Sequence, residues 1–197
     1  MAKERGSLSV SLPMLLMGLV LSGCASAKSP IYLNPGFKSL AIEEITVLPA
    51  VDARLDKTQN VDLQKQIRQT GANFLERKGY QVSQQDDLGG ATELTEEILK
   101  APDPEWVKHL GPPGARWVMV LTLDDLTTKL TFGSTGSAEL SGVLYDRTGG
   151  SIVWRDKGIA QVGQAGLIGM ALKGTMGGEA VRTALFNLLA SFPKRSK

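Results

Sequence analysis

Apolar positions after residue 40 recur with two different periods, and each period predicts one type of element. Over residues 61–78, apolar side chains return every three or four positions, which is typical of one face of a helix. β-Branched residues are frequent over 42–51, before this stretch, and residues 80–83 alternate between apolar and polar after it. This order predicts two parallel strands joined by a crossing helix.

The second half of the chain predicts antiparallel hairpins and a final helix. Residues 117–123 are almost continuously apolar, as in a central strand covered on both faces. Residues 126–132 alternate, and glycine-rich turns separate them from strands over 138–145 and 152–162. One helical face is predicted within 179–192, made of Val181, Ala184, Leu185, Leu188, Leu189 and Phe192.

The whole pattern predicts a mixed α/β (α+β) fold with a β-α-β start, antiparallel hairpins and a C-terminal helix. Helices are expected to pack on a sheet of five or six strands. Residues 92–110 favour short helical pieces interrupted at Pro102 and Pro104, because proline removes a backbone donor.

The first 23 residues have the layout of a secretory signal peptide. Lys3 and Arg5 supply positive charge, and an apolar run over residues 8–21 precedes small residues. A helix that spans a bilayer needs about 20 apolar residues, and Pro13 interrupts this run. A removable signal is therefore favoured over a permanent anchor.

Leu21, Ser22 and Gly23 before Cys24 resemble the lipobox of bacterial lipoproteins, where a leucine and two small residues precede an obligatory cysteine. This resemblance implies cleavage before Cys24, a diacylglycerol on its thiol and an N-linked acyl chain such as palmitate. Several acyl chains together give stable membrane attachment. Ala25, in place of the aspartate that retains many lipoproteins in the inner membrane, implies an outer-membrane anchor facing the periplasm. An inner-membrane or surface location stays open.

The remaining chain has the size of one domain. We expect a lipidated flexible tether over 24–40, a periplasmic α/β domain over 41–193 and a basic tail over 194–197. The 22 basic and 20 acidic residues nearly cancel, which argues against nucleic acid as a partner because such proteins show a clustered basic face.

Candidate catalytic and metal-binding residues are few, so we expect neither a catalytic nor a metal site, no cofactor beyond the lipid, and no enzyme activity. His109 is the only histidine, and Cys24 is the only cysteine. His109 lies near a predicted helix end, where a capping or surface role is expected. Adjacent acids such as Asp124 and Asp125 point to opposite faces of a strand unless a bulge turns one of them.

The glycine-rich segment 161–178 leaves three interpretations open. It contains six glycines and no acid, and its centre is apolar. It is a loop with a short apolar helix, a contact with another subunit or protein, or a contact with the membrane surface. The candidate contact residues are Gly166, Leu167, Ile168, Gly169, Met170 and Leu172.

Four segments together resemble one group of periplasmic lipoproteins, namely those related to a neisserial surface antigen. They are ITVLPAVDAR (45–54), FLERKGYQV (74–82), GARWVMVLTL (114–123) and LYDRTGGSIVW (144–154). The group has wider kinship to the curli-secretion lipoprotein, PelC, LpoB and the N-terminal domain of TolB. Arg116 and Gly150 depart from its usual aspartate and glutamate.

The resemblance implies a non-enzymatic domain that binds protein partners, often as an oligomer, during envelope assembly or export. We therefore expect a membrane-anchored accessory module of a cell-envelope complex whose protein partner is unknown, with a homo-oligomer as one option. One alternative is a subunit of an oligomeric outer-membrane export pore, because residues 126–132 and 138–145 alternate. The least favoured alternative is an envelope hydrolase, for which no nucleophile–base pair is visible.

Overall fold

The computed structural model describes residues 28–54, 62–86, 88, 94, 98–99, 101–131, 133–165 and 173–195. Its elements, in chain order, are β1 (Tyr32–Leu33), η1 (Phe37–Leu40), β2 (Glu44–Val47), β3 (Val51–Asp52), α1 (Leu63–Arg77), β4 (Gln81–Gln84), α3 (Pro104–Lys108), β5 (Trp117–Thr131), β6 (Gly133–Asp146), β7 (Ser151–Ala165) and α5 (Lys173–Ala190). The predicted α/β class is confirmed. The sheet has seven strands because the two-residue strands β1 and β3 join the expected ones.

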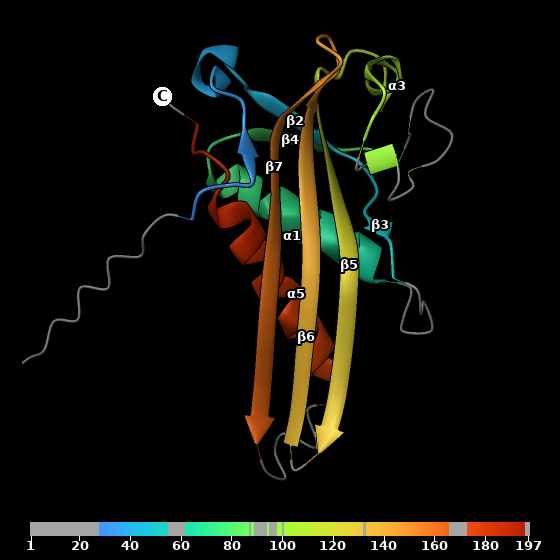
Figure 1. The fold of residues 1–197 in the computed structure, drawn as a ribbon, viewed down its shortest axis with the longest axis vertical. Helices are drawn as coiled ribbons and strands as arrows, with labels where there is room; N and C mark the ends of the chain where they lie inside the picture. The colour runs from blue at the N-terminus through green and yellow to red at the C-terminus, as the bar shows by residue number, and fades with distance from the viewer. Residues whose placement is uncertain are drawn as a thin grey trace, which may run out of the picture.

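The sheet is parallel at one side and antiparallel at the other. Its order is β1-β7-β6-β5-β2-β4, with β3 beside β5. β2 runs parallel to both β4 and β5, and α1 connects β2 to β4 as the sequence predicts. β5, β6 and β7 are antiparallel and have 14 or 15 residues each, so they extend well beyond the four-residue strands β2 and β4 (Figure 1).

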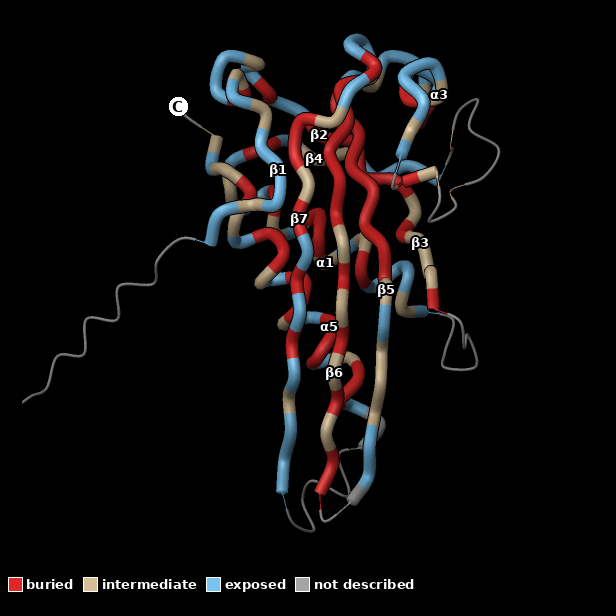
Figure 2. The backbone as a smooth tube through the Cα atoms, viewed as in Figure 1, coloured by how far each residue is buried: buried red, intermediate tan, exposed pale blue. Residues whose placement is uncertain are grey.

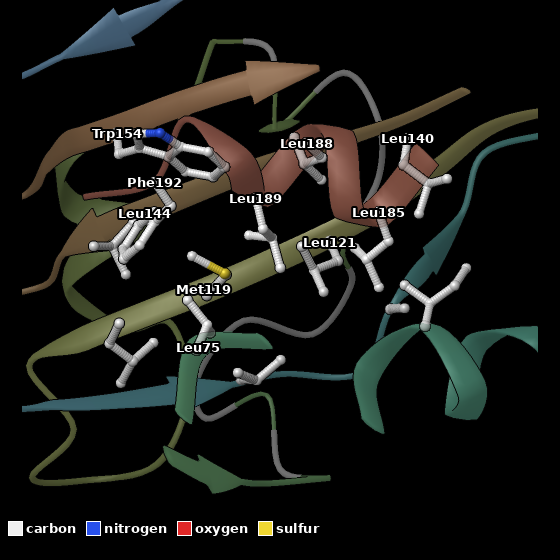
Figure 3. Close-up of a cluster of buried hydrophobic side chains, with 14 of the residues drawn as sticks. Leu75, Met119, Leu121, Leu140, Leu144, Trp154, Leu185, Leu188, Leu189 and Phe192 are labelled. Atoms are coloured by element: carbon white, nitrogen blue, oxygen red, sulfur yellow. The ribbon is translucent and has the colours of Figure 1, made fainter. Parts of the chain in front are cut away.

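The main core lies between the sheet and the two helices α1 and α5 (Figure 1). All six residues predicted to form the apolar face of the last helix are buried. The Trp154 ring on β7 meets Phe192 edge-on, with 5.0 Å between ring centroids (Figure 3). Leucines of α5 fill the space over Met119 and Leu121 of β5 (Figure 3).

α5 begins at Lys173, six residues before the start predicted from the sequence. Two strand glycines explain how the helix lies so close to the sheet. A Cβ at Gly136 would lie 2.5 Å from the Met176 carbonyl oxygen, and a Cβ at Gly158 would lie 2.5 Å from Leu188 N. The packing that these glycines permit offsets the low helix propensity of the glycines within α5.

A second core covers the opposite face of the sheet at the end near α3, which is at the top in Figure 1. Val107 of α3, Leu110 and Leu99 pack there against Val118 and other residues of β5 and β6. Pro104 is the first residue of α3 and does not interrupt a helix, because the first helical position needs no hydrogen-bonded N–H. The Asp103 carboxylate caps this helix by accepting from Glu105 N–H at 2.7 Å.

The described residues of the expected flexible tether, 28–40, form part of the domain. β1 and η1 fall in this range, and Phe37 is buried with its ring 5.7 Å from that of Phe192. The expected basic tail is also attached where it is described, since Arg195 donates to Glu43 at 2.8 Å. Burial of Phe37 against a residue from the far end of the chain is not visible in local sequence periodicity.

Candidate functional site

The two segments singled out from the sequence lie outside the described residues. These are Leu21, Ser22, Gly23 and Cys24, and the contact candidates over 166–172. Their neighbours are described, however. Lys28 follows Cys24 by four residues, Ala165 is the last residue of β7, and Lys173 begins α5. The candidate site is therefore built from β7, its strand partners and residues 28–33.

We define the distal ribbon as residues 125–131 of β5, 133–139 of β6 and 159–165 of β7. One face of the ribbon is covered by the start of α5, where Gly177 lies against Thr128, and Ala138 and Ala160 are buried. Figure 2 shows exposed residues along the lower parts of β5 and β7. By strand alternation, the residues that do not face α5 form the opposite face of the ribbon. Ile159 lies on this face with 64% of its surface exposed. The face combines charged residues, such as Asp125 and Glu139, and small polar residues with one large aliphatic side chain.

A β-bulge changes which way the acids of β5 point. The β5–β6 register shifts between Leu123 and Asp125. Asp124 Oδ1 accepts from Ser141 Oγ at 3.1 Å, while Asp125 pairs with Glu139, two residues from Ser141 on the same face of β6. Both aspartates therefore face the same side, which the sequence analysis allowed only through a bulge.

These acids do not stand alone on that face. Glu139 Oε1 lies 2.6 Å from Lys157 Nζ. A pocket of about 140 Å³ opens nearby, with Leu99 and Val143 among its apolar lining residues. Thr122 and Ser141 both bring a hydroxyl to this pocket. Ser141 donates to the Asp124 carboxylate, and the described lining residues include no histidine. This arrangement offers polar contacts and gives no support to nucleophilic catalysis.

Other parts of the protein pair with the outer edge of β7 over residues 153–159, its upper part in Figure 1. β1 pairs with Arg155 and Trp154. Three outward carbonyls accept hydrogen bonds: Val153 from Asn34 N–H at 2.9 Å, Lys157 from the Lys28 ammonium, and Ile159 from the Asn187 amide at 2.9 Å. By strand alternation, the next residues whose backbone N–H and C=O groups point to this edge are Gln161, Gly163 and Ala165. The described strand pairing gives these groups no partner at this edge.

A buried carboxylate fastens the start of the described chain to β7. Asp156 is completely buried and accepts from Ser191 Oγ at 2.6 Å. Lys28 Nζ lies 3.1 Å from the same oxygen, Asp156 Oδ2. The sequence pattern gives no sign of this contact, because it joins residues 128 positions apart.

Arg116 and Gly150, the two departures from the resemblance, have structural reasons. Arg116 donates to both oxygens of Asp146 at 3.1 Å, and its guanidinium lies 4.3 Å from the Trp117 ring. Burial raises the pKa of Asp146, but hydrogen bonds from Arg116 and from backbone N–H groups outweigh it and hold that pKa below its usual value. Gly150 has φ of +59°, and a Cβ there would lie 2.8 Å from the Pro104 carbonyl oxygen.

His109 ends α3 as its C-terminal cap and is exposed, which confirms the capping or surface role predicted for it. Within the described residues, histidine, cysteine and carboxylate side chains nowhere form the groups of three or more that would hold a metal ion. None of the described helices is both long and apolar enough to cross a bilayer.

Comparison with solved structures places this arrangement among known folds. The PelC dodecamer from Paraburkholderia phytofirmans superposes with a TM-score of 0.50 at 14% identity, over 86% of this chain and 96% of the PelC chain. The chain shares its fold with PelC. The resemblance found in the sequence is thereby confirmed for the fold.

Two bacterial lipoproteins are also similar in structure. Lipoprotein GNA1162 from Neisseria meningitidis gives a TM-score of 0.45 at 19% identity, over 70% of this chain and 98% of its own. A minor lipoprotein from Acinetobacter baumannii gives 0.35 at 12% identity, over 75% and 84%. No protein-family model matches the chain, and no curated protein matches it in sequence.

Proposed function

We propose that the protein is a lipid-anchored accessory protein of the bacterial cell envelope, and that it binds an envelope protein or a second copy of itself through the distal ribbon. Cys24 carries the diacylglycerol and the N-linked acyl chain, and the domain faces the periplasm from the outer membrane. The role is non-enzymatic, with the ribbon as a binding surface.

The edge of β7 at residues 161–165, its lower edge in Figure 1, carries this proposal, because no described strand pairs with it there. A strand edge presents backbone donors and acceptors that another strand can pair with. Natural proteins usually protect such edges, and here the upper edge is protected as far as Ile159 by Asn34, Lys28 and Asn187. Among the described residues, this protection ends at Ile159. Residues 166–172, the segment proposed from the sequence as a contact, follow the strand in the sequence.

The comparison with PelC supports an assembly role in one respect. The PelC structure is a dodecamer, and its subunit has the same fold as this chain. A cyclic ring of more than two copies requires a surface of each copy that meets a different surface of the next copy. The distal ribbon provides such a surface in this protein.

No specific observation supports either of the two alternative functions drawn from the sequence, the export pore and the envelope hydrolase. A pore that spans lipid needs an apolar outward face, yet the exposed face of the ribbon carries Asp125, Lys129 and Glu139, and α5 covers the other face. The hydrolase alternative has no nucleophile–base pair among the described residues of the pocket beside Ser141.

The proposal is tested with Gln161→Pro and crosslinking in intact cells. Gln161 turns its backbone N–H outward, so proline removes an edge donor and leaves the β6–β7 ladder in place. Gln84→Pro is the matched control, because Gln84 lies on β4, the opposite edge of the same sheet.

We expect Gln161→Pro to reduce the crosslinked assembly at least tenfold, while Gln84→Pro leaves it at the wild-type level. Both variants must retain the wild-type circular dichroism spectrum. Equal crosslinking in both variants and the wild-type protein would show that the β7 edge is not the contact.

A further inference from the structure

Three consecutive apolar residues beside the predicted anchor are exposed. Ile31, Tyr32 and Leu33 have exposed fractions of 63%, 42% and 37%. The other large exposed apolar side chains of the described chain are isolated, at Leu130, Ile159 and Phe186. Ile31 and Tyr32 line one hollow and so form a continuous apolar surface with it, whereas Leu33 pairs with Trp154 and faces the other side of the sheet. Continuous apolar surfaces mark contacts with protein or membrane.

The length of chain before this triplet limits how far it can lie from Cys24. Four residue steps separate Cys24 from Lys28, and a fully extended chain spans at most about 3.6 Å per residue, or about 14 Å in all. Lys28 is held against β7 by its contacts with Asp156 and the Lys157 carbonyl. A lipid on Cys24 therefore keeps Lys28 within about 14 Å of the leaflet surface, and Ile31 and Tyr32 follow Lys28 by three and four residues.

The chemistry of Ile31 and Tyr32 suits a bilayer interface. Tyrosine combines an apolar ring with a hydroxyl and is enriched at the level of lipid headgroups. A hollow of about 410 Å³ opens beside it, with Ile31, Tyr32, Pro102 and Ile152 among its lining residues. Arg155 also lines the hollow and donates to the Leu99 carbonyl at 3.1 Å. Apolar walls with one cation suit the glycerol region and phosphate of a phospholipid.

We propose that Ile31 and Tyr32, with the hollow that they line, form the surface through which the domain rests on the lipid bilayer. This inference builds on the anchoring at Cys24 given under the proposed function. The occupant of the surface is lipid, and contact with a protein or a second copy is an outcome that the test separates. The anchor then holds the domain in one orientation, because the membrane is contacted at two neighbouring points.

The single cysteine of the chain makes a direct test available. Lipid consumes the thiol of Cys24, so Tyr32→Cys in the mature lipidated protein carries the only reactive thiol. Phe186→Cys on α5 is the matched control, since its wild-type side chain is 56% exposed. Each variant is labelled with an environment-sensitive fluorophore and reconstituted in phosphatidylethanolamine–phosphatidylglycerol vesicles, with or without lipids that carry a quencher near the headgroup.

We expect the quencher lipids to reduce fluorescence at position 32 at least threefold more than at position 186. Equal quenching at both positions, in protein that floats with the vesicles, would overturn the membrane contact while the anchoring stands. If the fluorophore at position 32 is shielded from water but is not quenched by the lipids, the surface contacts protein. That result would also overturn the membrane contact. Failure to float would refute the anchoring itself, and this inference with it.

Discussion

Lys28 Nζ lies 3.1 Å from Asp156 Oδ2, although Lys28 stands at the start of the described chain and Asp156 is completely buried in β7. The contact ties the segment next to the predicted lipid anchor to the strand whose lower edge we propose as the binding surface. Strand residues advance about 3.3 Å each, so Ala165 lies about 30 Å along β7 from Asp156.

Replacing Lys28 by methionine should lower the free energy of unfolding by about 1–2 kcal/mol, because a buried carboxylate loses its cation and keeps the Ser191 hydrogen bond. Lys157→Met is the matched control. The two lysine side chains are 48% and 49% exposed, but Glu139, the partner of Lys157, is 33% exposed. The control should change stability by less than about 0.5 kcal/mol in urea denaturation. Equal losses would contradict the role assigned to Asp156.

Gly158→Ala should destabilise the domain by about 1–3 kcal/mol, because the new methyl group would overlap the backbone of α5 at Ala184 and Leu188. Gly163→Ala in the same strand is the control. Its Cβ would meet the end of the Thr135 side chain at 3.0 Å, a contact that a small rotation relieves. Thermal unfolding followed by circular dichroism measures both. A Gly158→Ala protein as stable as the control would mean that α5 lies farther from β7.

Asp146 should make stability depend on pH in the acid range. Its pKa is lower in the folded protein than its usual value of 3.8, so its contribution is present above that value and is lost as pH falls from about 4. Asp146→Asn should therefore be less stable than the wild type by about 1 kcal/mol at pH 7, and the gap should narrow below pH 4. Chemical denaturation at both pH values measures the gap. A constant gap would exclude a pKa shift at Asp146.

Gly150→Ala should loosen α3, because φ of +59° disfavours any side chain and a Cβ would press on Pro104. We expect a loss of about 1–3 kcal/mol, together with faster hydrogen exchange over residues 104–108. Gly149→Ala is the control, because the nearest atoms to its Cβ would be side-chain atoms of Asp146 and Ser151 at 3.3 Å or more. Unchanged hydrogen exchange over residues 104–108 in Gly150→Ala would show that this turn does not help to hold α3 in place.

The elements with a regular period could be predicted from the sequence. α1, α5 and the β-α-β start follow from the spacing of residues such as Ile67, Leu75, Leu185 and Leu188, all of which are buried. Local pattern is sufficient there because each element buries one regular face. The predicted strands over 117–123 and 126–132, by contrast, belong to a single strand, β5, as far as its end at Thr131, because the bulge at Asp124 shifts the apolar period without ending the ladder.

The candidate site depends on contacts between distant parts of the chain, which periodicity cannot reveal. The protected upper edge of β7 requires Asn34, Lys28 and Asn187 to meet one strand from three directions. The apolar triplet 31–33 was a signal in the sequence, since it stands between Pro30 and Pro35 in an otherwise polar stretch. The assignment of residues 24–40 as tether gave it no weight.

The central claim is that Cys24 carries lipid, and the intact mass of the mature protein extracted from membranes tests it most directly. The account predicts a chain that starts at Cys24 and is heavier than its residues by one diacylglycerol and one acyl chain. A mature chain with the mass of its residues alone, or one that retains residues 1–23, would contradict it.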